Sequence, residues 1–316
     1  MDSFVTRNFE SKSSKNNRLK GILFIFTGLI VIAAIVKVNS QQLINPVIES
    51  HALSVKEIKT EKNKGIPIAE LKEKVNNEIN TAEGTYSVYF YDLITGDNFG
   101  INEEMILTAA SVNKIPILAA LYYYAEKGVI DLDKMITLQA SDIQDYGTGS
   151  IRYDKPGTSY SIKTLARLMM EKSDNTAAYL LASEIIGLSE IQKLAEDWGM
   201  SQTNINDNKS SVRDIFSVLN KMYKGEITSP ELTLEMLGFM DDSDFEDRIP
   251  KGIPPNITVI HKTGNEVGNV HDAGIIDLPD RPYYLGVMTT DITNEEETKK
   301  KIARISQIVF SEVASL

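Results

Sequence analysis

Ser111 and Lys114 have the residue types and the spacing of a serine nucleophile beside a base. They lie in the stretch 109–118, where small residues lead into an apolar run. If a helix begins at the serine, both side chains lie on one face, one turn apart. The unpaired N–H groups of the first turn and the helix dipole would then stabilise an oxyanion. The pair predicts an activated nucleophile if further residues of a site accompany it.

Two further short motifs follow this pair along the chain. Ser173-Asp174-Asn175 falls at an expected turn between two helices, and Lys262-Thr263-Gly264 ends an expected strand. Runs of Ser, Asp and Asn often serve only to shape a turn. Each motif occurs once, however, and the three in this order indicate a three-sided site for serine acyl transfer.

The composition excludes several other kinds of site. The 316 residues contain no cysteine, so the protein has no disulfide, no thiol nucleophile and no thiolate metal site. The three histidines, His51, His261 and His271, lack a metal-ligand spacing, so we expect no metal and no cofactor. The net charge is −11, and an acidic protein does not present the basic face that nucleic acid requires.

The N-terminal part of the chain has the pattern of a membrane anchor. Residues 1–20 carry five basic residues against two acidic residues, and residues 21–38 form an apolar run whose single charge is Lys37. A basic flank before such a run predicts a single-pass anchor with the N-terminus in the cytoplasm. Residues 39–66 are polar and indicate a spacer, so the domain 67–316 is expected outside the cytoplasm, at the cell membrane. A cleaved signal peptide is the main alternative, and a buried core helix is a third.

The periodicity of the remaining chain predicts a helix and a hairpin, then a block of helices, then strands and a last helix. The expected helices are 68–79, 117–126, 162–172, 176–186, 190–198, 212–223 and 294–315, and the expected strands are 86–92, 98–101, 257–261, 273–277 and 283–289. Strands near the two ends of a domain can join in one sheet. We therefore expect an α/β (α+β) fold with a five-stranded antiparallel sheet, flanking terminal helices and an inserted helical block.

Together these motifs resemble the active-site serine penicillin-recognising superfamily, and within it the class A β-lactamases are the most similar. The likeness runs from about residue 68 to the C-terminus and includes Ser173–Ala178, His261–Gly264 and His271–Gly274. The resemblance implies a β-lactamase/transpeptidase-like fold and a serine hydrolase that acts on amide C–N bonds. It implies a β-lactam or a peptidoglycan-type peptide as substrate, or another amide or ester. We expect the protein to be a monomer.

The resemblance also implies roles for the catalytic residues. Ser111 would attack an acyl carbonyl, and Lys114 would accept its proton as a neutral amine. Burial and the nearby charge of Lys262 would lower the pKa of that amine. Ser173 would pass the proton to the leaving nitrogen, and Asn175 would bind the substrate amide or steady Lys114.

By the same resemblance, the substrate-binding residues are Tyr146, Thr263, Gly264 and Asn265. Thr263 would bind the substrate carboxylate together with Lys262. The N–H groups of Ser111 and Asn265 would form the oxyanion hole. Tyr146 lies in a Gly-rich loop that lacks a phosphate-loop lysine, so we do not expect this loop to bind a nucleotide.

The chain departs from the class A pattern in one loop. Class A enzymes carry a Glu between the second and third motifs, where it activates water for deacylation. The corresponding residues 199–212 contain no Glu, and Asp207 is their only carboxylate. We therefore expect acylation by penicillin but slow deacylation. Two alternatives stay open: an efficient β-lactamase that uses Asp207 as the base, and a penicillin-binding sensor in which the acylated serine is a signal.

Overall fold

The computed structural model describes residues 65–316. The basic segment 1–20, the anchor 21–38 and all but the last two residues of the spacer 39–66 lie outside the described residues. In the described part of the chain, no helix is both long enough and apolar enough to cross a membrane.

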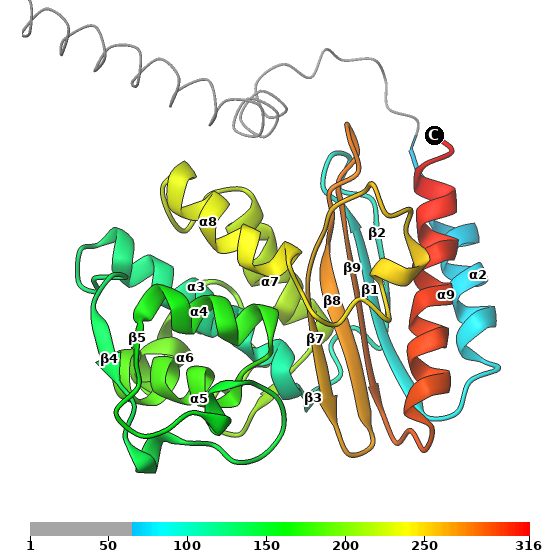
Figure 1. The fold of residues 1–316 in the computed structure, drawn as a ribbon. Helices are drawn as coiled ribbons and strands as arrows, with labels where there is room; N and C mark the ends of the chain where they lie inside the picture. The colour runs from blue at the N-terminus through cyan, green and yellow to red at the C-terminus, as the bar shows by residue number, and fades with distance from the viewer. Residues whose placement is uncertain (1–64) are drawn as a thin grey trace, which may run out of the picture. The chain divides into compact units, whose positions relative to one another are not determined.

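A five-stranded sheet with the order β2-β1-β9-β8-β7 forms the centre of the domain (Figure 1). Its strands are β1 Thr85–Asp92, β2 Asn98–Ile101, β7 Val259–Glu266, β8 Asn269–Ile276 and β9 Tyr283–Thr290. All neighbouring strands are antiparallel. The pairing of β1 with β9 joins the N-terminal hairpin to the C-terminal strands, so the predicted five-stranded antiparallel sheet is confirmed.

One face of this sheet is covered by the two terminal helices, α2 (Ile68–Ile79) and α9 (Glu295–Val313), which lie side by side (Figure 1). Alternate residues of the strands point to this face because side chains of a strand alternate between faces. They form one buried cluster with the apolar sides of both helices, which includes Leu71, Val88, Phe90, Leu285, Val287, Ile302 and Ile305. The Asn294 side chain caps α9 by accepting a hydrogen bond from Glu297 N at 3.2 Å.

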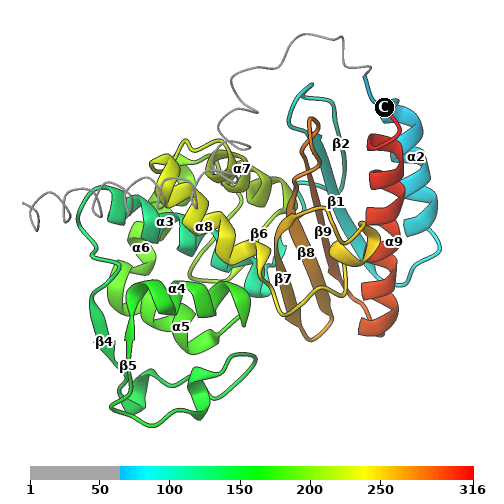
Figure 2. The ribbon, with the colours of Figure 1, turned by 45° about the horizontal axis from the view of Figure 1, so that its top comes forward.

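The helical block covers the opposite face of the sheet (Figure 2). Its members are α3 Lys114–Glu126, α4 Ile162–Glu171, α5 Asn175–Tyr179, the π-helix η4 Leu180–Ile186, α6 Leu188–Asp197, α7 Val212–Tyr223 and α8 Pro230–Asp241. Helix α7 packs directly on the sheet, where the Phe216 ring lies 5.2 Å from the rings of Tyr89 and Tyr284. Tyr284 also donates its hydroxyl proton to Val212 O at 2.9 Å. These contacts position the first turn of α7 against the middle of the sheet.

Short elements connect the block to the sheet. Two small antiparallel sheets pair β3 Leu107–Thr108 with β6 Lys209–Ser210, and β4 Met135–Thr137 with β5 Ser159–Ser161. The described 3-10 turns are η1 Ala110–Asn113, η2 Ala140–Asp142, η3 Ile151–Tyr153 and η5 Pro250–Gly252. The β3–β6 pair places the chain after residue 199 beside the chain that leads into Ser111.

Several local predictions were wrong. Ser111 does not begin an α-helix, because it lies in the 3-10 turn η1, and α3 begins at Lys114. The triplet Lys262-Thr263-Gly264 lies inside β7, since pairing with β8 continues to Glu266. The expected helix 176–186 is the short α5 followed by a π-helix. Helix α8 was not predicted, because its apolar residues are not confined to one face.

The layer between α2 and the sheet yields a stability test. Leu71 is fully buried there, whereas Lys72 next to it is exposed. We expect Leu71→Ala to lower the free energy of unfolding by about 2–5 kcal/mol, because it removes buried methyl groups and leaves a cavity. Denaturant unfolding measures the loss, with Lys72→Ala as the control that changes it by less than about 0.5 kcal/mol. Equal losses in both variants would contradict the packing of α2 described above.

Candidate active site

The turn that carries Ser111 is held in an unusual backbone conformation. Ala110 has a φ of 49°, in the left-handed region that residues other than glycine rarely adopt. The turn is held on both sides of this residue, because Ala109 N donates to Asn208 O at 2.9 Å and Val112 N donates to Ala109 O at 3.1 Å. Such strain persists only where the surroundings enforce it, and it is concentrated at functional sites.

The Lys114 side chain is buried, with 6% of its surface exposed, at the first position of α3. Its amine donates to Ser173 O at 2.6 Å, to Ser173 Oγ at 3.2 Å and to Asn175 Oδ1 at 2.8 Å. The structure therefore brings the lysine of the first motif together with the serine and the asparagine of the second. These hydrogen bonds tie Lys114 to the Ser173 turn rather than to the Ser111 hydroxyl.

Two buried lysines of the site have lowered pKa values, and the charge of Lys262 contributes to the shift of Lys114. Burial lowers the pKa of Lys114 well below its ordinary value, the positive charge of Lys262 lowers it further, and Asp174 opposes both effects. Burial also lowers the pKa of Lys262 to about 7, where Asp272 opposes the shift and Arg248 adds to it. The lowered pKa of Lys114 favours the neutral amine that a proton acceptor must be.

Asp174 fixes the shape of the Ser173 turn, a role that the sequence did not reveal. Its carboxylate caps α5 by accepting from Ala177 N at 3.0 Å, and it accepts from Ile151 N at 2.9 Å. Only 1% of its surface is exposed. Ser173 itself has a φ of 51°, so this buried carboxylate helps to hold a strained residue in place.

The Gly-rich loop packs against the same turn. Asn175 N donates to Thr148 O at 3.1 Å, and Thr148 Oγ1 donates to Ser173 O at 2.8 Å. Asn175 Nδ2 donates to Tyr146 O at 3.2 Å. Tyr146 thus supports the site through its carbonyl group, while its side chain is 63% exposed.

The third motif approaches the Ser111 turn from β7. Lys262 and Thr263 are buried, with 1% and 4% of their surfaces exposed. A Cβ atom on Gly264 would lie 3.0 Å from Ala109 O and 3.1 Å from a methyl group of Val112. The glycine therefore permits the close approach of β7 to the nucleophile turn.

Arg248 is a residue of this site that sequence reasoning missed. Its guanidinium group is 2% exposed and donates through Nη2 to Asn265 Oδ1, whose amide in turn donates to Glu295 Oε2 at 3.3 Å. The donors Nε and Nη1 have no hydrogen-bond partner. Nη1 has only a long ion-pair contact with Asp247 Oδ1, at 3.6 Å. A buried guanidinium beside Lys262 whose donors lack hydrogen bonds is suited to bind an anion. Nothing in the irregular sequence around Arg248 indicates this placement.

The two described histidines are fully buried and differ in their protonation state. Burial opposes protonation of His261, but Asp272 at 2.8 Å and Glu246 at 3.2 Å raise its pKa to about 9. Burial lowers the pKa of His271 to about 4, and its Nε2 donates to Thr108 O at 2.8 Å. His261 is therefore a cation and His271 a neutral link between β8 and β3 at neutral pH.

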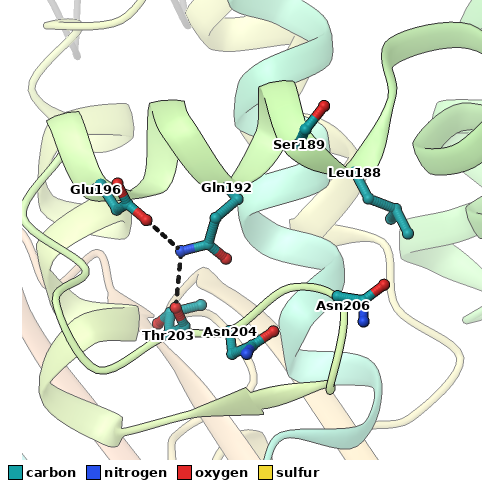
Figure 3. Close-up of a pocket in the computed structure, with 7 residues that line it drawn as sticks. All are labelled: Leu188, Ser189, Gln192, Glu196, Thr203, Asn204 and Asn206. Carbon is teal, nitrogen blue, oxygen red and sulfur yellow. Dashed lines mark hydrogen bonds between the residues drawn. The ribbon is translucent and has the colours of Figure 1, made fainter.

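Residues 199–212 form a compact turn that Gln192 of α6 holds in place. The Gln192 amide donates to Thr203 O at 3.0 Å (Figure 3) and accepts from Ile205 N at 2.9 Å. Asp207 is exposed at the tip of the turn and accepts from Asn204 Nδ2 at 2.9 Å. Its neighbour Asn208 accepts a hydrogen bond from Asn113 Nδ2 at 3.0 Å.

A pocket of about 430 Å³ lies between α6 and this turn (Figure 3). Its lining residues are Leu188, Ser189, Gln192, Glu196, Thr203, Asn204 and Asn206, and none of them is a predicted site residue. Within residues 65–316, no three His, Asp or Glu side chains are placed to hold a metal ion.

Two glycines with the same backbone conformation offer a matched test of the Gly-rich loop. Gly147 and Gly128 both have a φ of 68°. A Cβ atom would lie 2.4 Å from Asn175 Nδ2 at position 147 but would have no neighbour within 4 Å at position 128. Both alanine variants incur a left-handed backbone cost of about 1 kcal/mol. We expect Gly147→Ala to cost about 1 kcal/mol more in denaturant unfolding, because the Asn175 amide must leave Lys114.

Comparison with known proteins identifies the family of this chain. The model of the beta-lactamase enzyme family matches residues 70–313 of this chain. A beta-lactamase of Bacteroides uniformis is 24% identical over 271 residues, which cover 77% of this chain and 91% of that protein. Beta-lactamase 3 of Bacillus cereus is 24% identical over 255 residues, which cover 75% of this chain and 78% of that protein.

Solved structures show the same fold. A mutant of PBP-A in an acyl-enzyme complex with penicillin G is 26% identical, with a TM-score of 0.74 over 78% of this chain and 97% of that chain. The beta-lactamase of Sphaerobacter thermophilus DSM 20745 is 24% identical, with a TM-score of 0.74 over 79% of this chain and 99% of that chain. The predicted fold and family resemblance are confirmed: this chain is a β-lactamase-like serine hydrolase and belongs to the beta-lactamase enzyme family.

Proposed function

We propose that this protein is acylated at Ser111 by β-lactams, or by a cell-wall peptide, amide or ester, and that it hydrolyses the acyl-enzyme slowly. The observation that supports this function most directly is the buried Lys114 amine, whose pKa is lowered and which contacts Ser173 and Asn175. A lowered pKa favours the neutral form of the amine, which can accept a proton from a serine hydroxyl.

The acylation step follows from the arrangement of the three motifs. Lys114 Nζ takes the proton of Ser111, whose Oγ attacks the acyl carbonyl carbon. The N–H groups of Ser111 and Asn265 stabilise the oxyanion. The C–N bond then breaks, and Ser173 Oγ, 3.2 Å from Lys114 Nζ, delivers the proton to the leaving nitrogen.

Substrate binding rests on the cationic side of the site. Lys262 and Thr263 bind the substrate carboxylate, and the Arg248 donors that lack a hydrogen-bond partner supply further hydrogen bonds to it. Gly264 keeps this strand close to the Ser111 turn. Asn175 lies between Lys114 and the Tyr146 carbonyl, from where it can also contact a substrate amide.

We propose a slow second step from the carboxylate content and the geometry of the turn 199–212. Residues 199–212 contain no Glu, and Asp207 is exposed on a turn where its hydrogen bonds go to neighbouring asparagines. A general base must be within hydrogen-bond reach of the water that it activates. An efficient β-lactamase with Asp207 as base, or a sensor that signals by remaining acylated, is the competing function.

We also propose that residues 21–38 anchor the protein in the cell membrane as a single span, with the hydrolase domain outside the cytoplasm and acting as a monomer. The basic segment before an apolar run whose single charge is Lys37 supports this placement.

Intact-protein mass after mixing with penicillin G tests both chemical steps. We expect an adduct of one penicillin that forms on the wild-type protein, persists for minutes or longer, and is absent from Ser111→Ala. It persists because water attacks the ester without a positioned base. We expect Asp207→Asn to leave its lifetime unchanged.

Other outcomes would redirect the proposal. An adduct that clears within seconds while hydrolysed penicillin accumulates, together with a longer lifetime in Asp207→Asn, would establish an efficient β-lactamase. An adduct on Ser111→Ala would exclude Ser111 as the nucleophile. No adduct on either protein would exclude penicillin G as a substrate.

The pKa values of the two lysines predict a bell-shaped pH dependence of acylation. At acid pH Lys114 is protonated and cannot accept the Ser111 proton. As pH rises through the pKa of Lys262 at about 7, its ammonium loses charge and binds the substrate carboxylate less well. The second-order rate constant of acylation should therefore fall on both sides of a maximum.

Replacement of Lys262 separates the two limbs of this profile. In Lys262→Arg the guanidinium keeps its charge, so we expect the alkaline limb to move up by about two pH units or more, with a lower maximum. The acid limb, which reports Lys114, should move much less. Lys127→Arg on the exposed end of α3 is the control. An unmoved alkaline limb would show that Lys262 does not set it.

A further inference from the structure

The expected carboxylate-binding residues are shut off from solvent. Lys262 is 1% exposed and Arg248 is 2% exposed. The one hydrogen bond of the Lys262 amine in the described structure goes to Thr263 O at a long 3.3 Å. Two donors of Arg248, Nε and Nη1, have no hydrogen-bond partner, and Nη1 lies 3.6 Å from Asp247 Oδ1. These cationic groups are therefore buried with few close partners, although burial of weakly paired charge is costly.

Residues 244–248, which we name the strap, cover this subsite. They belong to the irregular connection between α8 and η5. The half-buried ring of Phe245 lies over the Lys262 amine, with 5.7 Å between Nζ and the ring centroid. A cation over an aromatic face is an attractive contact, and it takes the place of an anion here.

Each end of the strap is attached to a different part of the domain. At the first end, Asp244 accepts two hydrogen bonds of 2.7 Å from the Lys172 amine, and its N–H donates to Glu171 O at 3.1 Å. Lys172 directly precedes Ser173. At the second end, Asp247 pairs with Lys299 of α9 at 3.3 Å. The strap therefore runs from the Ser173 turn of the helical block to the terminal helix behind the sheet.

Between these ends the strap contacts the edge strand β7. Glu246 binds His261 Nε2 at 3.2 Å, and Phe245 lies on Lys262, the next residue of the strand. Arg248, the last residue of the strap, donates a hydrogen bond to Asn265, which also belongs to β7. Every residue of the strap thus makes a side-chain contact with a partner outside it.

We propose that the strap closes the carboxylate subsite and that Phe245 is a specificity-determining residue, which the carboxylate of an acyl donor must displace to reach Lys262 and Arg248. This inference rests on the proposed function, because it takes acyl donors with a carboxylate as substrates. The closed strap reduces apparent affinity by the fraction of molecules that are open. Donors without a carboxylate do not need the subsite and escape this reduction.

Removal of the ring should open the subsite. We expect Phe245→Ala to raise the second-order rate constant for acylation of the full-length protein by penicillin G by about tenfold. With penicillin G methyl ester, whose carboxylate is blocked, the rate constant should change by less than about twofold. Asp244→Asn, which weakens the attachment to Lys172, should change the same ratio in the same direction by a smaller factor. Tyr124→Ala, which removes a half-buried aromatic ring on α3, is the control and should leave the ratio unchanged.

A second readout does not depend on acylation. Trace labelling with acetic anhydride transfers an acetyl group to exposed neutral amines, and peptide mass spectrometry locates it. We expect Phe245→Ala and Asp244→Asn to increase labelling of Lys262 relative to the exposed Lys127. If no β-lactam acylates any variant, the proposed function fails while this labelling still decides the role of the strap. Unchanged Lys262 labelling, or a rate constant that falls or changes equally for penicillin G and its ester, would overturn the proposal.

Discussion

The site depends on an amine that is buried, hydrogen-bonded and close to a second cation. Water would keep Lys114 protonated, and a protonated amine cannot take a proton from Ser111. Burial and the charge of Lys262 work together to lower the pKa, while Asp174 limits the shift. These groups come from three separate segments of the chain. The pKa of Lys114 is therefore lowered only when the helical block packs against the sheet.

At the site, the packing of the helical block against the sheet involves two strained turns. Ala110 and Ser173 both have left-handed φ values, each of which costs on the order of 1–3 kcal/mol in a residue other than glycine. Buried hydrogen bonds offset the cost. Asn208 O holds the first turn and Asp174 holds the second. The strain points the Ser111 and Ser173 backbone in directions that a regular helix does not provide.

The sequence was sufficient for the periodic elements and for the motif residues, but not for their surroundings. Helices Ile68–Ile79 and Val212–Tyr223 have the predicted bounds because their apolar spacing is local information. The 3-10 turn at Ser111 was mistaken for an α-helix, because the φ of Ala110 depends on residue 208, which is distant in sequence. Arg248 was missed for the same reason: its place in the site comes from packing of an irregular segment.

In the proposed function, the residues that carry out acylation and the turn that would supply a base for deacylation lie in different parts of the fold. The groups proposed for acylation lie on the three motifs or, for Asn265, directly after the third, and Lys114, Ser173 and Lys262 among them are buried. Deacylation would need a base from residues 199–212, yet Gln192 and Asn113 hold this turn in a compact form with its carboxylate at the exposed tip. Asn208 of the turn contacts Ala109 and Asn113 beside Ser111, and the β6 residues Lys209 and Ser210 pair with β3. In the proposed function, a longer turn ahead of these contacts could bring a carboxylate to the ester without disturbing the motifs. In the proposed function, turnover thus depends on the turn 199–212, whereas acylation depends on the buried residues of the three motifs.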